Sequence, residues 1–136
     1  MLRFIRPRVP MATILLVDDN PLRASLRQSI LERSVQDVVR ASDASEALCL
    51  VELPEFARSL RLVITGNQMS AISGPEFVSE LRSRLPLVPV LVLSTDPEDE
   101  REYEGIPRVF HSQAHSTDEL RAVVTGLLRS AEKQSA

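Results

Sequence analysis

The chain has 136 residues, of which 43% are apolar and 26% charged, and its formal net charge is −3; this composition is typical of one globular domain and excludes a disordered chain. Basic residues do not cluster on any one predicted helix, so we expect no nucleic-acid partner. No apolar run approaches the roughly 18 residues of a membrane helix, and the single Cys49 excludes an internal disulfide, which together favour a cytoplasmic protein away from the membrane.

The first ordered segments alternate between strand and helix. Residues 13–17 form a continuous apolar, β-branched run, which indicates a buried strand. Asn20 as N-cap and Pro21 as first residue then predict a helix that runs to about residue 33. The predicted core stripe of this helix is Leu22, Leu26 and Ile30.

The middle of the chain repeats this alternation twice. Residues 37–41 predict a second strand, and Ser42 or Asp43 is a suitable cap for the helix that follows. Residues 62–64 predict a third, fully buried strand. After a loop, Ser73 with Glu76 three residues later forms a capping box, which predicts the third helix.

The last third of the chain contains the remaining elements. Residues 88–93 predict the fourth strand, residues 96–104 a short helix or an acidic loop, and residues 107–110 the fifth strand. Ser116 and Glu119 form a second capping box before a strongly amphipathic final helix.

This order predicts an α/β fold. A strand and a helix alternate five times, which gives a five-stranded parallel sheet with helices on both faces. The spacing suits the flavodoxin-like strand order 2-1-3-4-5. We expect a domain over residues 12–130, with flexible tails at residues 1–11 and 131–136. Translation from Met1 and translation from Met11 both fit this pattern.

In such a sheet the carboxyl ends of the strands form the functional edge. This places Asp18 and Asp19 beside residues 66–68, residues 94–95 and residues 111–113. Two adjacent carboxylates are the hard oxygen ligands that Mg²⁺ prefers. The alternative is that the pair only begins a helix, where negative charge suits the helix dipole.

The segments ILLVDDN, LVITGNQMSAISGPEF, VPVLVLST and STDEL resemble the receiver domain of bacterial two-component response regulators, over roughly residues 13–129. The resemblance implies a CheY-like fold and a role in phosphorelay signal transduction. In that family an acidic pair after the first strand binds Mg²⁺, and an Asp that ends the third strand accepts a phosphoryl group from a histidine kinase.

Carried over residue by residue, the resemblance matches Asp18 and Asp19 to the acidic pair and Ser94 to the hydroxyl that bonds a phosphate oxygen. The acceptor position falls on Gly66, and no carboxylate occurs from residue 56 to residue 75. Because glycine has no side chain, no aspartyl-phosphate can form at Gly66. We therefore interpret Gly66, Ser94 and their neighbours as a vestigial phosphorylation site.

The fifth strand carries the remaining family positions. One register puts Gln113 at the position of the family's Lys and Phe110 at that of its switch aromatic; the other puts Ser112 and Val109 there. Neither register has a Lys. With the acceptor and the Lys both missing, we expect no cofactor, and Mg²⁺ binding that is weak if it occurs at all.

We therefore expect a stand-alone pseudo-receiver that acts as a phosphorylation-independent protein-interaction module and not as an enzyme. The resemblance implies a working face made by the fourth helix, fifth strand and fifth helix, which would bind another signalling protein (a kinase, an output protein or a receiver) or form a homodimer. On this face we expect Glu98, Glu100, Glu102 and Tyr103. The alternative is that this acidic run is a solvated surface.

Two other functions remain open from the sequence. One is a phosphorylatable receiver with an atypical acceptor among Asp18, Asp19 and Ser94. The other is a small Mg²⁺-dependent enzyme that uses the Asp pair, although no phosphate-binding glycine loop or nucleophile motif accompanies it.

Overall fold

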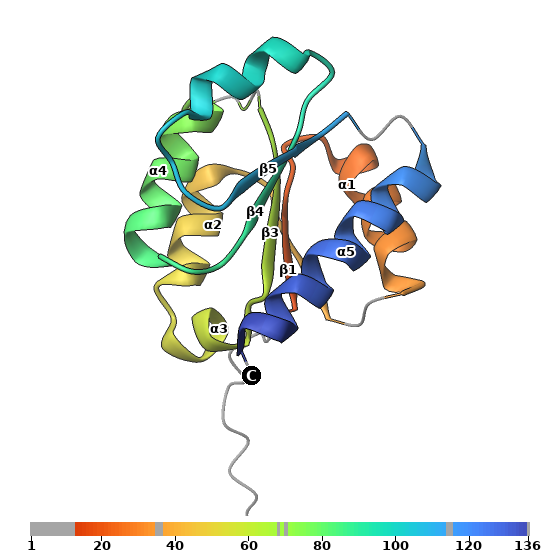
Figure 1. Ribbon diagram of the computed structural model, residues 1–136, viewed down its shortest axis with the longest axis horizontal. Coiled ribbons are helices and arrows are strands. Elements are labelled where there is room, and N and C mark those ends of the chain that lie inside the picture. The colour runs from red at the N-terminus through yellow and green to blue at the C-terminus, as the bar shows by residue number, and fades with distance from the viewer. Residues whose placement is uncertain (1–12, 35–36, 68, 70, 114–115, 136) are drawn as a thin grey trace, which may run out of the picture.

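The computed structural model describes residues 13–34, 37–67, 69, 71–113 and 116–135. The predicted tail at residues 1–11 and the choice between Met1 and Met11 lie outside these residues. The five strands are β1 (Ile14–Val17), β2 (Val38–Ala41), β3 (Leu62–Gly66), β4 (Val90–Leu93) and β5 (Val109–Ser112). They form one parallel sheet in the order β2-β1-β3-β4-β5 (Figure 1), which confirms the predicted fold.

Helices cover both faces of this sheet. They are α1 (Pro21–Glu32), α2 (Ala44–Val51), α3 (Pro54–Ser59), α4 (Gly74–Arg84), the 3-10 helix η1 (Pro97–Tyr103) and α5 (Thr117–Ser135). Helices α1 and α5 lie on one face, and α2, α3 and α4 lie on the other (Figure 1). The predicted caps are confirmed. Side-chain oxygens of Asn20, Asp43, Ser73 and Ser116 accept hydrogen bonds from the backbone three residues later at 2.7–3.2 Å.

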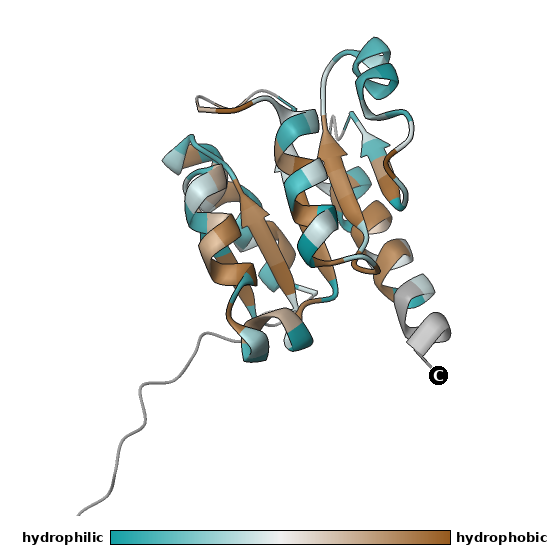
Figure 2. Ribbon diagram, turned by 90° about the vertical axis from the view of Figure 1, so that its left-hand side faces the viewer, coloured by the Kyte–Doolittle hydropathy of each residue, from teal (hydrophilic) through white to brown (hydrophobic). Residues whose placement is uncertain are grey.

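Alternate residues of the central strands supply two separate cores. Leu15 and Val63 point toward α2 and α4, whereas Leu16 and Ile64 point toward α1 and α5. Because both faces are covered, these strands are apolar throughout, as Figure 2 shows in brown. The two cores hold the sheet in place, and the sheet in turn positions the carboxyl ends of its strands at one edge.

Helix α1 is rotated relative to its predicted orientation. The predicted stripe is wrong for Leu22 and Leu26, which are 84% and 63% exposed, although Ile30 is buried as expected. Ala24 and Leu31 face the sheet instead. In the same rotation Arg23 and Arg27 point over the end of β1, where they bind a carboxylate.

Three smaller boundaries also differ from expectation. The short helix α3 was not predicted as a separate element. Strand β5 begins and ends two residues later than predicted, because Val90 to Leu93 pair in register with Val109 to Ser112. Helix α5 continues to Ser135, past the expected domain end at residue 130.

Tyr103 corrects the predicted interaction face. Its side chain is 3% exposed and belongs to the core on the α4 side of the sheet. The tight turn of η1 brings the last residue of this acidic segment back onto the domain. The Tyr103 ring meets that of His111 edge-on at 5.1 Å. Glu98, Glu100 and Glu102 are exposed, as expected.

Candidate functional site

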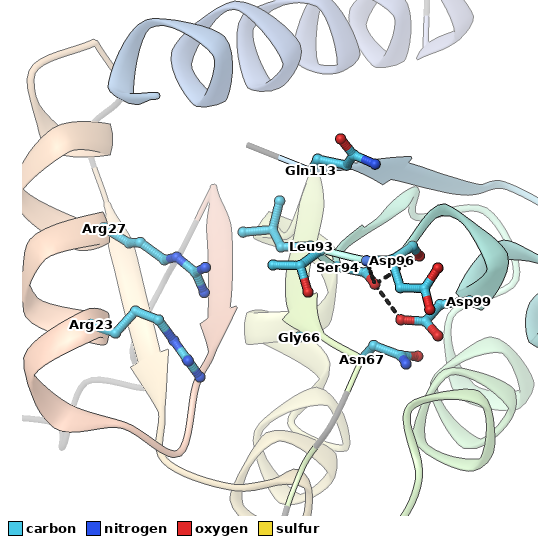
Figure 3. A pocket seen from close by; sticks show the side chains of 10 residues that line it. Arg23, Arg27, Gly66, Asn67, Leu93, Ser94, Asp96, Asp99 and Gln113 are labelled. Carbon is cyan, nitrogen blue, oxygen red and sulfur yellow. Dashed lines mark hydrogen bonds between the residues drawn. The ribbon is translucent and has the colours of Figure 1, made fainter. Parts of the chain in front are cut away.

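The predicted site residues lie at the carboxyl edge of the sheet. Gly66 ends β3 and Ser94 follows β4, and the backbone N–H of Ser94 donates to Ser112 of β5 at 3.1 Å. A cavity of about 410 Å³ opens above these strand ends (Figure 3). Its lining is Arg23, Arg27, Gly66, Asn67, Leu93, Ser94, Thr95, Asp96, Asp99 and Gln113. The structure therefore brings together the predicted acceptor, hydroxyl and Lys positions.

The acidic pair does not line this cavity. Asp18 and Asp19 line a smaller cavity of about 170 Å³ between α1 and the β2–α2 connection. Arg23 and Arg27, which line the larger cavity, both bond to Asp18. Phe110 lines neither of these two cavities and is 41% exposed on β5. The pair and the acceptor position thus line different cavities.

Asp18 is the most heavily hydrogen-bonded carboxylate of the described chain. Arg23 donates from Nε and Nη2 to Oδ2 and Oδ1 of Asp18 at 2.9 and 2.7 Å. Arg27 donates from Nη1 to Oδ2 at 3.0 Å, and the backbone N–H of Asn20 donates to Oδ1 at 3.0 Å. The Asp18 side chain is 1% exposed. Both oxygens are therefore saturated by donors of the chain itself.

These contacts control the charge of the cluster. Burial by itself raises the pKa of Asp18, but the hydrogen bonds from Arg23 and Asn20 and the charges of both arginines outweigh it, so the pKa lies below its usual value. The hydrogen bond to Asp18 raises the pKa of Arg23. Burial lowers the pKa of Arg27, and the charge of Asp18 partly offsets this. Asp18 is consequently ionised at neutral pH, with two cations beside it.

This arrangement does not fit a bound Mg²⁺. A metal ion needs free carboxylate lone pairs, whereas the lone pairs of Asp18 are taken by Arg23 and Arg27. Asp19 is left with a longer 3.6 Å contact to Arg23, and Gly66 offers no third carboxylate. Within the described residues, no group of three acidic, His or Cys side chains is placed to hold a metal. The guanidinium groups supply the positive charge instead.

Ser94 points away from Gly66 and toward η1. Its hydroxyl bonds to a carboxylate oxygen of Asp99, and its oxygen accepts from the backbone N–H of Asp96 at 3.2 Å (Figure 3). Asp96 in turn caps η1 by accepting from the N–H of Glu98 at 2.9 Å. The residue at the predicted hydroxyl position thus holds the start of η1.

Tyr103 fixes the loop that follows β3. Its hydroxyl donates to Oδ1 of Asn67 at 2.5 Å, and the backbone N–H of Gly74 donates to the Asn67 carbonyl at 3.1 Å. A Cβ atom on Gly74 would lie 2.1 Å from the Tyr103 hydroxyl and 2.6 Å from the Asn67 carbonyl oxygen. Only glycine fits at position 74, where the chain passes this close to Tyr103 and Asn67. The hydrogen bond between Tyr103 and Asn67 connects the loop to η1.

The sequence reasoning missed Arg23, Arg27 and Asp99 as residues of the site. One signal for the arginines was present. Basic side chains in the first turns of a helix oppose its dipole, and α1 has no acidic residue in its first turn. Two arginines four residues apart, soon after an acidic pair, therefore predict that a carboxylate of this pair lies beside them. Asp99 gave no such signal, because it lies within a run of exposed acids.

A family model for the response regulator receiver domain matches residues 14–122. The chain belongs to the response regulator receiver family. It is 30% identical over 122 residues, 88% of its length, to the alkaline phosphatase synthesis transcriptional regulatory protein PhoP of Bacillus subtilis. The chain spans about half of that relative, 49%.

Solved receiver structures share the fold. The chemotaxis response regulator CheY4 of Vibrio cholerae has a TM-score of 0.73 at 24% identity, covering 86% of this chain and 98% of that one. The signal receiver domain of an HD domain-containing protein from Pseudomonas fluorescens has a TM-score of 0.77 at 20% identity, covering 98% of both chains. These likenesses confirm the CheY-like fold of this receiver domain.

The family assigns the receiver domain to two-component signalling, where such domains interact with kinases or output proteins and are not in general enzymes. Among the described residues, no helix of this receiver domain has the length and apolar character needed to cross a membrane.

Proposed function

We propose that this receiver domain works without phosphorylation, as a protein-interaction module of two-component signalling. The observation that carries the proposal is the pairing of Gly66 at the acceptor position with Asp18 neutralised by Arg23 and Arg27. A receiver that cycles through a phosphoryl group needs an acceptor and a free cation site. This chain lacks a side chain for the first, and its own arginines take the second.

The atypical acceptors fit the geometry less well. Both oxygens of Asp18 are bound by guanidinium groups, and attack on a phosphoryl donor would require breaking these contacts. Ser94 is engaged with Asp96 and Asp99. Asp19 is partly exposed, but it lines the smaller cavity and not the one that Gly66 lines.

Treatment with a small phosphoryl donor such as acetyl phosphate in the presence of Mg²⁺ tests the proposal. Intact-protein mass spectrometry should show no phosphorylated native protein, and beryllofluoride should leave its amide NMR spectrum unchanged. Gly66→Asn is the matched control for Gly66→Asp, because it adds equal bulk without a carboxylate. Phosphate on native Asp18, Asp19 or Ser94 would replace this proposal with an atypical receiver.

The Gly66→Asp variant shows how much of the switch remains. If this variant is phosphorylated and Gly66→Asn is not, the rest of the site still functions and the acceptor alone was lost. If neither is phosphorylated, the missing Lys and the arginine contacts also block the chemistry. Both results leave the native protein phosphorylation-independent.

We place the working surface on η1, β5 and α5. Glu98, Glu100 and Glu102 are exposed on η1, and the nearby β5 exposes 41% of Phe110. An exposed aromatic side chain is typical of a protein-binding surface. Because this surface is acidic, a partner with basic side chains fits better than a second copy of the chain, whose own glutamates would repel it.

Sedimentation velocity distinguishes a second copy of the chain from a different partner on this surface. We expect a monomer at low and high salt. A dimer that is lost in Phe110→Asp but kept in Leu87→Asp would assign the surface to a second copy. Leu87 is the matched control, because it is 73% exposed between α4 and β4, at the opposite end of β4 from Ser94.

A further inference from the structure

The cavity above Gly66 has walls of opposite charge. Arg23 and Arg27 of α1 form one wall, and Asp96 and Asp99 at the start of η1 form the other (Figure 3). The side chains lie on opposite sides of the strand ends, and no salt bridge joins the two walls in the part of the chain that the structure describes. The opposite charges therefore face each other across open space.

The positive wall retains hydrogen-bond donors. The contacts to Asp18 use Nε and Nη2 of Arg23 and Nη1 of Arg27, which leaves Nη1 of Arg23 and Nη2 of Arg27 for a ligand in the cavity. The Arg27 side chain is only 22% exposed, so water screens its charge less than that of a surface arginine. Two guanidinium edges held in place by Asp18 are preorganised to bind a carboxylate.

The negative wall retains acceptors. One oxygen of Asp99 bonds to Ser94, and Oδ1 of Asp96 caps η1. The second oxygen of each carboxylate remains for a cation. Because Ser94 and the η1 backbone hold both side chains in place, this wall is preorganised as well.

The floor between the walls includes two residues without polar side-chain atoms. Leu93 and Gly66 line it, and the missing side chain of Gly66 contributes to the open volume. At about 410 Å³, the cavity lies near the small end of the range for small-molecule sites, roughly 300–1,000 Å³. It is larger than a single ion requires.

We propose that this cavity binds a small zwitterion of amino-acid size, with its carboxylate against Arg23 and Arg27 and its ammonium group against Asp96 and Asp99. Such a ligand would complete both walls at once and connect α1 to η1. The site would give the module an input that replaces phosphorylation. In this respect it rests on the proposed function, because a phosphoryl group bound in a working receiver site beside Ser94 would occupy the same space.

The test is a titration of the native chain, without any phosphoryl donor, against each of the twenty standard amino acids. Calorimetry and amide NMR should reveal at least one that binds saturably, with shifts centred on Gly66, Ser94 and Asp99. Acetate, methylammonium and inorganic phosphate are the probes with one kind of charge, and each should bind at least tenfold more weakly. If no amino acid saturates the shifts, or if acetate or phosphate binds equally well, the proposal is wrong.

Matched variants locate the binding. Asp99→Asn and Arg27→Gln should each weaken binding at least tenfold. Glu98→Gln, the neighbouring carboxylate on η1, and Arg84→Gln, an arginine paired with Glu80 on α4, should not change it. Unchanged affinity in Asp99→Asn would overturn the proposal even if Arg27→Gln failed to fold. A failure here leaves the phosphorylation result above intact, because that experiment uses no amino acid.

Discussion

Arg23 donates two hydrogen bonds to Asp18 from one edge of its guanidinium group, Nη2 to Oδ1 at 2.7 Å and Nε to Oδ2 at 2.9 Å. Bidentate pairs of this kind are the strongest charge-assisted hydrogen bonds in proteins. The contact converts the residue that matches the family's metal ligand into a structural anchor for α1.

The first prediction concerns Mg²⁺. The native protein should show no Mg²⁺-dependent change in its amide spectrum, because Asp18 has no free oxygen lone pair. The double variant Arg23→Gln, Arg27→Gln should gain weak Mg²⁺ binding, with shifts centred on Asp18 and Asp19. Arg84→Gln is the control for loss of an arginine elsewhere. A native protein that binds Mg²⁺ as well as the double variant would show that the arginines do not block the site.

The second prediction separates the two members of the acidic pair. Asp18→Ala leaves Arg23 and Arg27 without their main partner, and removing one side of a buried ion pair costs about 3–5 kcal/mol. Since both arginines are partly exposed and regain water, we expect about 2 kcal/mol in urea unfolding. Asp19→Ala should cost less than about 1 kcal/mol, because its side chain is 33% exposed. Equal losses would contradict the assigned roles.

The third prediction concerns how the free energy of unfolding changes at low pH. The pKa of Asp18 is lower in the folded protein than its ordinary value of 3.8. Its stabilising effect is therefore complete above pH 3.8 and is lost as the pH falls through the folded value. In Asp18→Asn this part of the pH dependence should disappear, so the unfolding free energies of variant and native protein converge at low pH. Parallel curves would mean that Asp18 does not change its protonation on unfolding.

The fourth prediction concerns His111, whose Nδ1 is buried and makes no hydrogen bond within the described residues. Burial lowers the pKa of His111 below 6.5, and the charges of Glu100 and Asp99 partly offset this. The neutral ring next to Tyr103 thus adds stability that is present above pH 6.5 and lost as the pH falls through the folded value. His111→Phe keeps an aromatic ring there and should flatten the part of the stability profile that lies below pH 6.5. An unchanged slope would exclude His111 as its source.

Much of this molecule follows from its sequence. The strand order was predicted from the alternation of strands and helices. The helix starts were predicted because Asn20, Ser73 and Ser116 act through local contacts that spacing alone reveals. The resemblance to receiver domains put Gly66 at the acceptor position after the predicted strand, and the structure has Gly66 as the last residue of β3. Local spacing does not fix how a helix turns against a sheet.

The rotation of α1 shows why the rest was missed. Leu22 and Leu26 form the most obvious apolar spacing, yet they face solvent while Ala24 packs inward. The observed rotation of α1 also pairs the buried charge of Asp18 with two arginines. Leaving that charge unpaired would cost far more free energy than exposing two leucine side chains. Tyr103 was missed similarly, because it lies within an acidic run and the turn of η1 alone carries it inward.

The last prediction tests how η1 is tied to the β3–α4 loop. Tyr103→Phe removes the hydrogen bond to Asn67 and should cost about 1 kcal/mol in unfolding free energy. Gly74→Ala should cost more, because its Cβ would lie 2.1 Å from the Tyr103 hydroxyl and 2.6 Å from the Asn67 carbonyl oxygen. In the double variant the first clash is gone and the second remains, so the loss should be smaller than the sum of the single losses. Additive losses would show that Tyr103 and Gly74 do not meet. Ser83→Ala, an exposed change on the same helix, is the control and should leave the effect of Tyr103→Phe unchanged.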